Sequence, residues 1–239
     1  MSNLRPNGAQ VSNSAGSTTG AVSFMNRFSN TTREVAQNGR RGALMLTMDI
    51  AHPDIEEFIT IKQDLTKVTG ANISVRLSDE FMKAVEKDEE FGLRSPHNKK
   101  IIEKISARAL WIKILTARVE TGEPYILFID SVNRSIPEHH KKLNLNVKTS
   151  NLCSEITLPT GLDHLNNERT AVCCLSSLNL EFYENWKDHP QIIEDIMRFL
   201  DNVLQDFIDK APDSMSRAKY SATRHKSWSC WLLSRSRKN

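Results

Sequence analysis

Short apolar runs of strand length, separated by amphipathic segments with helical spacing, constrain the fold of this chain more than any other feature. The run YILFI at residues 125–129 is typical of a strand buried on both faces of a parallel sheet. Such alternation along most of the chain predicts an α/β fold. Strands are expected at residues 43–50, 71–77, 125–129, 147–158 and 171–180. Helices are expected at residues 21–37, 54–61, 78–90, 107–119 and 190–208.

Length, hydropathy and charge narrow the class of protein. A chain of 239 residues with 39% hydrophobic content can build a core. Neither a run of roughly 18 to 20 apolar residues nor a basic segment followed by an apolar run is present, so we expect a cytoplasmic protein with no membrane association. Residues 217–239 hold seven Lys or Arg and no acidic residue, whereas the rest has 25 basic against 29 acidic residues. The charge of the body therefore gives little reason to expect nucleic-acid binding.

The cysteine and histidine patterns do not indicate a metal site. The four cysteines are Cys153, Cys173, Cys174 and Cys230. A vicinal pair without any CxxC spacing favours neither a secreted disulfide framework nor structural zinc. The PEHHKK segment at residues 137–142 has no other ligand type at suitable spacing, so a solvated turn and no bound metal are expected. His52, before Pro53, is expected only to mark the start of a helix.

The segment SNLCSEI at residues 150–156 is the most informative for function. If it is a strand, Asn151, Cys153 and Glu155 project from one face, because side chains alternate along a strand. A face with an amide, a thiol and a carboxylate is costly to bury without partners, so such a face usually lines a site. The alternative from alternation alone is an edge strand whose polar residues meet solvent.

SNLCSEITLPT, followed by AVCCLSSLNL, resembles the active-site region of ribonucleotide reductase large subunits. The combination N-x-C-x-E, LPT and C-x-L-S-x-x-N-L is specific. The resemblance continues upstream through TGEPYILFIDSVN, GRRGALMLTMDIAHPDIEEFI and SNLRPNGAQV, and covers roughly residues 1–226. It implies a partial ten-stranded α/β barrel with a radical-bearing loop inside it. The implied reaction replaces the ribose 2′-hydroxyl of a ribonucleotide with hydrogen, which supplies deoxyribonucleotides for DNA synthesis.

The resemblance also implies roles for individual residues. Cys153 would carry the thiyl radical that takes the 3′-hydrogen, Glu155 would accept the 3′-hydroxyl proton, and Asn151 would hold the sugar. The residue types suit these roles: a cysteine with a pKa of about 8.5 is mainly S–H at neutral pH, and a glutamate is already ionised. A generic thiol enzyme with Cys153 as nucleophile is less favoured, because a neighbouring carboxylate raises a thiol pKa.

Cys173 matches one member of the redox pair that supplies two electrons in this family, although an off-by-one choice with Cys174 stays open. Cys174 is expected to be a small buried hydrophobe on the other strand face. The family's partner cysteine lies upstream, whereas no cysteine precedes Cys153 here. The phosphate-binding segment, the radical-path tyrosines and the re-reducing cysteines of the family would lie downstream. We therefore expect an incomplete large subunit that is inactive by itself.

Residues 1–42 resemble the effector-loop region of the family, and residues 43–226 its barrel. Arg5 matches an arginine that contacts effector phosphates, which the guanidinium fork suits. Gln37 and Arg41 match the loop that relays effector identity to the substrate base. The alternative for both arginines is an ordinary solvated loop position.

The resemblance implies partners and an external radical source. No cofactor is expected within the chain, because a metal-containing small subunit or adenosylcobalamin would supply the radical. The expected partners are a ribonucleotide substrate, dNTP or ATP effectors, the flanking segments and a second copy of the full subunit. Ribonucleoside-diphosphate reduction is the expected activity, with triphosphates left open. The rival is a non-catalytic module that binds an effector or another reductase fragment.

The last residues, 227–239, do not continue the resemblance. The family's pattern continues with a glycine-rich segment after KAPDSMSRAKYSATR, whereas this chain reads HKSWSCWLLSRSRKN. Trp and Cys codons both begin with TG, as glycine codons preceded by T do when they are read one base out of frame. We therefore predict a frameshift after about Lys226, which resequencing of the DNA would test.

Overall fold

The computed structural model describes residues 1–35, 39–224 and 228–233, with side chains up to residue 224. These residues form two compact units. Unit 1 comprises Met1–Glu138 and Val147–Leu158, and unit 2 comprises His139–Asn146 and Pro159–Asn239.

A parallel three-stranded sheet forms the centre of unit 1. Its strands are β1 (Met45–Asp49), β2 (Asn72–Leu77) and β5 (Tyr125–Phe128), with β2 in the middle. All three strands were predicted from the sequence. The run at β5 is not buried on both faces throughout, because Phe128 at its end is 44% exposed.

The two faces of this sheet differ in polarity, because neighbouring side chains in a parallel register point the same way. The apolar face belongs to the core and carries Leu46, Met48, Ile73, Val75 and Leu77. The opposite face carries Thr47, Asp49, Asn72, Ser74 and Arg76. A polar face of this kind needs hydrogen-bond partners, and a segment from later in the chain supplies several of them.

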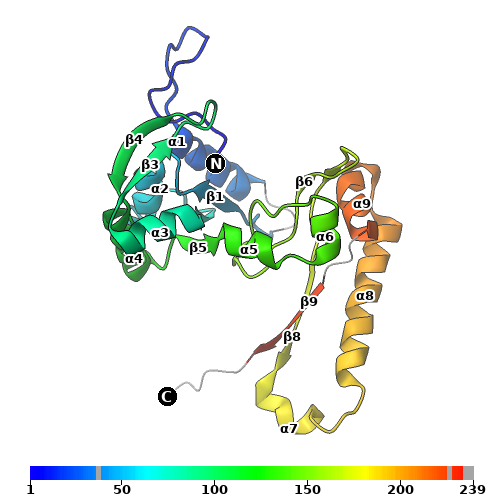
Figure 1. The fold of residues 1–239 in the computed structure, drawn as a ribbon. Helices are drawn as coiled ribbons and strands as arrows, with labels where there is room; N and C mark the ends of the chain where they lie inside the picture. The colour runs from blue at the N-terminus through cyan, green and yellow to red at the C-terminus, as the bar shows by residue number, and fades with distance from the viewer. Residues whose placement is uncertain (36–38, 225–227, 234–239) are drawn as a thin grey trace. The chain divides into compact units, whose positions relative to one another are not determined.

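Among its described residues unit 1 has five helices, and Figure 1 shows α2, α3 and α4 grouped together. They are α1 (Ala21–Glu34), α2 (Ile55–Thr60, continued by the 3-10 turn Ile61–Gln63), α3 (Asp79–Lys87), α4 (Ala107–Thr121) and α5 (Ile129–Ser135). Serine caps begin two of them: the Ser78 hydroxyl accepts the backbone N–H of Phe81, and Ser106 accepts that of Ala109. Gly122, at φ 80°, ends α4 in the left-handed conformation.

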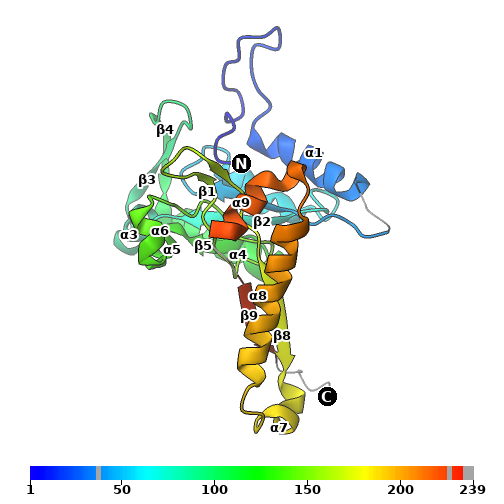
Figure 2. The same ribbon diagram turned by 90° about the vertical axis from the view of Figure 1, so that its right-hand side faces the viewer.

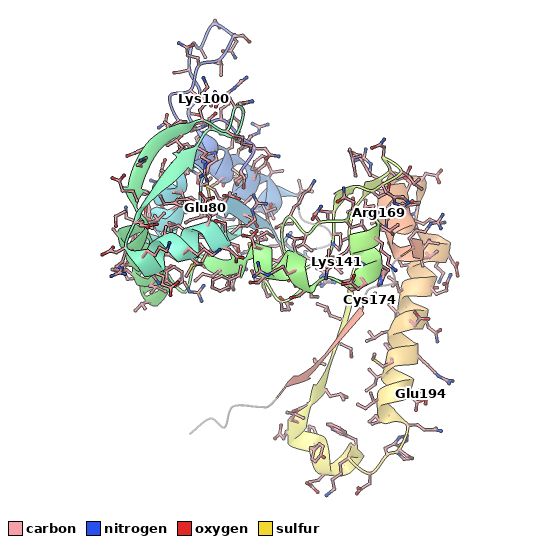
Figure 3. The ribbon with its side chains drawn as sticks, in the orientation of Figure 1. Glu80, Lys100, Lys141, Arg169, Cys174 and Glu194 are labelled. Carbon is pink, nitrogen blue, oxygen red and sulfur yellow. The ribbon has the colours of Figure 1, made fainter. Side chains whose placement is uncertain are left out.

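The antiparallel hairpin of β3 (Glu90–Arg94) and β4 (Ile101–Ser106) was not predicted. The charged residues before it resemble a solvated helix end, and β4 is largely exposed, so its apolar pattern is weak. Phe91 and Leu93 of β3 are nevertheless buried in the core. Arg94 also pairs with Glu80 of α3 at 2.6 Å, and Figure 3 marks Glu80 on that helix.

Unit 2 contains a long helix beside a strand, as Figure 2 shows for α8 and β8. Its elements are α6 (Glu138–Lys142), β6 (Gly161–Leu162), β7 (Glu168–Arg169), β8 (Cys174–Asn179), the 3-10 turn Leu180–Phe182, α7 (Tyr183–Trp186), α8 (Ile192–Lys210), the 3-10 turn Asp213–Met215, α9 (Ser216–Arg224) and β9 (Trp228–Leu233). The predictions of β8 and α8 are confirmed. The backbone of β9, within the tail, pairs in parallel with β8.

The expected solvated turn at residues 137–142 is wrong. These residues include helix α6, and His140 is only 7% exposed. Burial lowers the pKa of His140, and the nearby His139 and Arg169 lower it further. The sequence suggested a solvated turn because most residues of this segment are polar and exposed, and only the ring of His140 is buried.

A buried ion pair fixes the β6–β7 hairpin of unit 2 to α9. Asp163 accepts hydrogen bonds from Arg169 Nη2 at 2.8 Å and from the Tyr220 hydroxyl at 3.0 Å. Its other oxygen accepts the backbone N–H groups of Leu165 and Asn167, both at 2.9 Å. Burial by itself raises the pKa of Asp163, but these donors outweigh burial and hold the pKa well below the usual carboxyl range.

We expect Asp163→Asn to lower the Tm of unit 2, because the substitution leaves the buried guanidinium of Arg169 without its counter-charge. A carboxyl group whose pKa is lowered by folding stabilises the folded state at pH values above its ordinary pKa. This contribution is lost as the pH falls through the pKa of the folded state. The Tm difference from the unsubstituted chain should thus hold between about pH 7 and pH 5 and shrink below about pH 4.

Thermal melts followed by circular dichroism check this prediction. Glu168→Gln is the matched control, because it removes an exposed ion pair with Arg217 from the same hairpin, and such pairs contribute little. Equal Tm losses for the two variants, or a loss that does not depend on pH, would contradict the assignment.

Candidate functional site

The segment predicted as a strand at residues 147–158 is a loop, so that prediction is wrong. The loop is closed by Asn151, whose backbone N–H donates to the Ile156 carbonyl at 3.0 Å. The Ile156 N–H in turn donates to Asn151 Oδ1 at 2.9 Å. Ser154, at φ 66°, makes the reversal. A side-chain amide thus takes a backbone hydrogen bond that a strand ladder would otherwise use.

This loop, residues 147–158, is attached to the polar face of the unit 1 sheet. Its Thr149 hydroxyl lies 2.8 Å from that of Thr47 in β1. In β2, Arg76 donates to the Lys148 carbonyl at 2.9 Å, and Asn72 donates to that of Leu152 at 3.2 Å. Side chains from two strands therefore hold the loop, and those of β2 bond its backbone on both sides of residue 150.

A side chain of α5 adds a further anchor. Asn133 Oδ1 accepts the backbone N–H of Val147 at 2.8 Å, and Asn133 Nδ2 donates to the Val147 carbonyl at 3.1 Å. The amide thereby pairs with both polar groups of one residue, much as a neighbouring strand would. Loop residues 147–152 are positioned by hydrogen bonds along most of their length.

The structure brings the three predicted loop residues together on one turn, although not on one strand face. Cys153 and Glu155 are exposed, whereas their neighbours Leu152, Ser154 and Ile156 are half-buried. The Cys153 thiol is not in a disulfide. The turn therefore presents a thiol and a carboxylate two residues apart to the same surrounding solvent.

Asn151 has a structural role that the sequence did not reveal. Its Oδ1 atom closes the loop, while its Nδ2 group makes no hydrogen bond within the residues that the structure describes. The amide can therefore keep the turn closed through its oxygen and still donate from its nitrogen. Asn151→Asp would separate loop closure from hydrogen-bond donation, because aspartate keeps the acceptor oxygen and loses the N–H donors.

Two pockets of unit 1 border the anchored loop. One, of about 720 Å³, is lined by residues 1–4, the start of β1, Phe28, Arg76, Lys148 and Thr149. The other, of about 420 Å³, is lined by Arg33, residues 41–44, residues 69–72 and Leu152. Cationic side chains line both pockets, a composition that suits anionic groups such as phosphates. Arg41 and Leu152, the residue that precedes Cys153, both line the second pocket.

The predicted effector residues lie in unit 1 where the structure describes them. Arg5 and Arg41 are both exposed, and their side chains make no hydrogen bond or ion pair within the described part of the chain. Gln37 lies outside the described residues. The structure does not place Arg5 among the residues that line the two pockets.

The predicted redox cysteine lies in unit 2. Cys173 is half-buried and immediately precedes β8, whose first residue is Cys174 (Figure 3). Cys174 packs against the small core of Leu204, Ile208 and Ala222, and burial raises the pKa of its thiol. This packing agrees with the hydrophobic role expected for Cys174, although its side chain is half-buried rather than fully buried.

The supporting residues of the loop were missed by sequence reasoning. They are Thr47, Asn72, Arg76 and Asn133. A signal existed for the first three, because polar residues occupy every second position of LTMDI and ANISVRL. Such alternation marks a sheet face that is not part of the apolar core. Asn133 gave no comparable signal.

No group of three or more His, Cys, Asp or Glu side chains that could hold a metal ion occurs among the residues that are described. Within the same residues, no helix combines the length and apolar character needed to cross a membrane.

The fold and the site together define a class: an α/β protein that presents a cysteine and a glutamate on a loop held by a polar sheet face. The comparisons with known proteins agree with this class. Residues 1–228 match the family model "Ribonucleotide reductase, barrel domain". The chain belongs to this family.

Similar proteins occur in a virus and in Thermoplasma acidophilum. The chain is 49% identical over 130 residues to the ribonucleoside-diphosphate reductase large subunit of Invertebrate iridescent virus 3, covering 54% of this chain and 20% of that protein. It is 36% identical over 212 residues to the vitamin B12-dependent ribonucleoside-diphosphate reductase of Thermoplasma acidophilum, covering 85% of this chain and 26% of that protein. The chain thus spans less than a third of each relative.

A solved structure gives the same result for the fold. The class Id ribonucleotide reductase alpha subunit of Actinobacillus ureae superposes with a TM-score of 0.73 at 30% sequence identity. The match covers 96% of this chain and 39% of that subunit. The partial α/β barrel of the ribonucleotide reductase type, predicted from the sequence, is confirmed.

Proposed function

We propose that this chain is part of the catalytic large subunit of a ribonucleotide reductase, and that its substrates are ribonucleoside diphosphates. The observation that carries the proposal is the anchored loop, which exposes Cys153 and Glu155 beside a polar sheet face in a chain of this family. The diphosphate specificity is supported by the names of the relatives from Invertebrate iridescent virus 3 and Thermoplasma acidophilum.

In the proposed reaction, the Cys153 thiol loses its hydrogen atom to an external oxidant and becomes a thiyl radical. The sulfur then takes the 3′-hydrogen of the ribose, so that an S–H bond forms as the C–H bond breaks. Glu155 accepts the proton of the 3′-hydroxyl. In this role it must lie within hydrogen-bond reach of that proton in the substrate complex. Asn151 donates from Nδ2 to the sugar while its oxygen keeps the loop closed.

The 2′-hydroxyl leaves as water, and two electrons with two protons must be supplied. The S–H group of Cys153 then returns its hydrogen atom to the 3′ carbon, which regenerates the thiyl radical. We assign Cys173 as one of the two thiols that deliver the electrons and protons and become a disulfide, with its partner in the upstream segment of the full subunit. Packing supports this choice over the neighbouring residue, because Cys174 lies against the core and burial raises its pKa, which keeps it a thiol.

The effector part of the proposal involves Arg5, Gln37 and Arg41. The exposed guanidinium of Arg5 is available for effector phosphates. Arg41 shares a pocket with Leu152, beside Cys153, which supports a relay from the effector to the substrate. The probes for this site are dATP and ATP.

The radical comes from outside this chain in the proposed enzyme, either from a metal-containing small subunit or from adenosylcobalamin. The exposed thiol of Cys153 fits an external oxidant, and relatives of the B12-dependent type are among those matched. The remaining proposed partners are the flanking segments and a second copy of the full subunit. A thiol that must stay reduced between turnovers also suits a cytoplasmic location.

Reconstitution tests the proposed function. The chain is mixed with separately expressed flanking segments of the large subunit, and a ribonucleoside diphosphate is offered with a small subunit or adenosylcobalamin in turn. We expect deoxyribonucleotide with one of the two radical sources. No product with either source, from segments that assemble with the chain, would overturn the proposal.

A non-catalytic effector-binding module is the second candidate. The exposed arginines and the pocket of Arg41 lie in unit 1, so effector binding does not require the cysteines of unit 2. Binding of dATP without turnover in the assembled mixture would favour this candidate over the enzyme.

A further inference from the structure

The residues that precede and begin α2 hold both ends of the loop formed by residues 4–20, which carries Arg5 near its start. His52 Nδ1 accepts the backbone N–H of Asp54 at 3.0 Å, which leaves Nε2 as the nitrogen that donates to the Leu4 carbonyl at 2.9 Å. Asp54 Oδ1 accepts the backbone N–H of Asn7 at 2.9 Å. Arg5 therefore lies between two backbone groups that are fixed by side chains about fifty positions along the chain.

The same carboxylate also binds the far end of the loop. Asp54 Oδ2 accepts the backbone N–H of Ala21, the first residue of α1, at 2.8 Å. One buried side chain thus joins the two points at which residues 8–19 leave the body of unit 1. Figure 1 shows this segment, in dark blue, projecting from the unit. Among the residues that the structure describes, no backbone hydrogen bond joins the loop tip to the rest of the unit outside the loop.

The tip is paired within itself, so its position depends on this base. The backbone N–H of Gly8 donates to the Thr18 carbonyl, and the N–H of Thr18 donates to the Ala9 carbonyl, both at 2.9 Å. Gly20, at φ 86°, closes the base, and a Cβ there would lie 2.8 Å from both Asn7 N and Asp54 Oδ2. The close approach requires glycine and shows how tightly the two ends meet.

We propose that His52 and Asp54 are positioning residues for Arg5, so that the HPD segment sets the affinity of the loop for an effector triphosphate. This inference rests on the effector role proposed for Arg5. Asp54 acts through the backbone at both ends of the loop, and His52 acts through the residue next to Arg5. Neither side chain needs to touch the effector.

Asp54→Asn tests the proposal, because an amide presents one N–H donor where a carboxylate oxygen accepted a bond. Hydrogen exchange should become about tenfold faster at Asn7 or Ala21 in the 239-residue chain. The affinity for dATP should fall by about tenfold as the loop loses its fixed position. Glu57→Gln is the matched control: it removes an exposed carboxylate from the same helix and should change neither quantity.

A double-mutant cycle separates positioning from general destabilisation. If Asp54 acts through Arg5, Asp54→Asn should weaken dATP binding in the native background but not in an Arg5→Ala background. Equal losses in both backgrounds would overturn the proposal. Gly20→Ala offers a second route, because its methyl group pushes the two ends apart while Asp54 is kept; unchanged exchange and binding in this variant would also overturn it.

Separate outcomes test the effector role of Arg5 and the positioning role of Asp54. If Arg5→Ala leaves dATP affinity unchanged while Arg27→Ala, an exposed control on α1, does the same, the effector role of Arg5 is wrong, and the positioning claim falls with it. If Arg5→Ala weakens binding and Asp54→Asn changes neither exchange nor affinity, the effector role stands and the positioning claim alone is wrong.

Discussion

Cys153→Ser is expected to abolish ribonucleotide reduction by the reconstituted large subunit. Serine has nearly the shape of cysteine, but its O–H bond is too strong for the hydroxyl to serve as the hydrogen-atom carrier. The loop should survive the change, because its closing bonds come from the backbone and from Asn151, not from the Cys153 side chain. A loss of activity can therefore be assigned to the thiol itself.

The measurement is deoxyribonucleotide formation under the conditions in which the unsubstituted chain is active, with hydrogen exchange at Ile156 as the control for loop structure. Product should fall below detection in the variant, whereas the Ile156 amide should exchange as before. Activity retained by the Cys153→Ser chain would remove this residue from the reaction and with it the proposed chemistry.

Glu155→Gln should lower kcat by about 10² to 10⁴, the usual contribution of a positioned general base. Glutamine keeps the size of the side chain and cannot accept the 3′-hydroxyl proton. The substitution should leave KM little changed, since the proposed contribution belongs to proton transfer and not to substrate binding.

Steady-state kinetics on the reconstituted subunit decides this second prediction. Glu57→Gln, the same exchange at an exposed position of α2, is the control and should leave kcat as it is. An effect confined to KM would point to a binding role for Glu155. Equal kcat values for Glu155→Gln and the unsubstituted chain would exclude it as the base.

Much of the fold could be predicted because local periodicity determines it. The strands β1, β2 and β5 and the helices α1, α4 and α8 all carry their own apolar pattern in the sequence. The loop at residues 147–158 could not be read this way. Its alternating apolar and polar residues imitate a strand, but the side chain of Asn151 competes for the Ile156 N–H and closes a turn.

The structural supports were less predictable because they join residues far apart in the sequence. Asp163 meets Tyr220 across 57 positions, and Asn72 reaches the Leu152 carbonyl across 80. Periodicity carries no information about such pairs. The chemistry of Cys153 and Glu155, in contrast, was indicated by a family motif before any geometry was known, and their roles stay predictions until tested.

The most direct test of the central claim is a competition between ribonucleotides that carry protium and deuterium at the 3′ carbon, in the reconstituted subunit. A carbon–deuterium bond breaks more slowly than a carbon–hydrogen bond. If the Cys153 sulfur breaks this bond, the unlabelled ribonucleotide should be consumed faster by the unsubstituted chain, and neither should be consumed by Cys153→Ser. Consumption of both at equal rates, or any turnover by Cys153→Ser, would contradict the account.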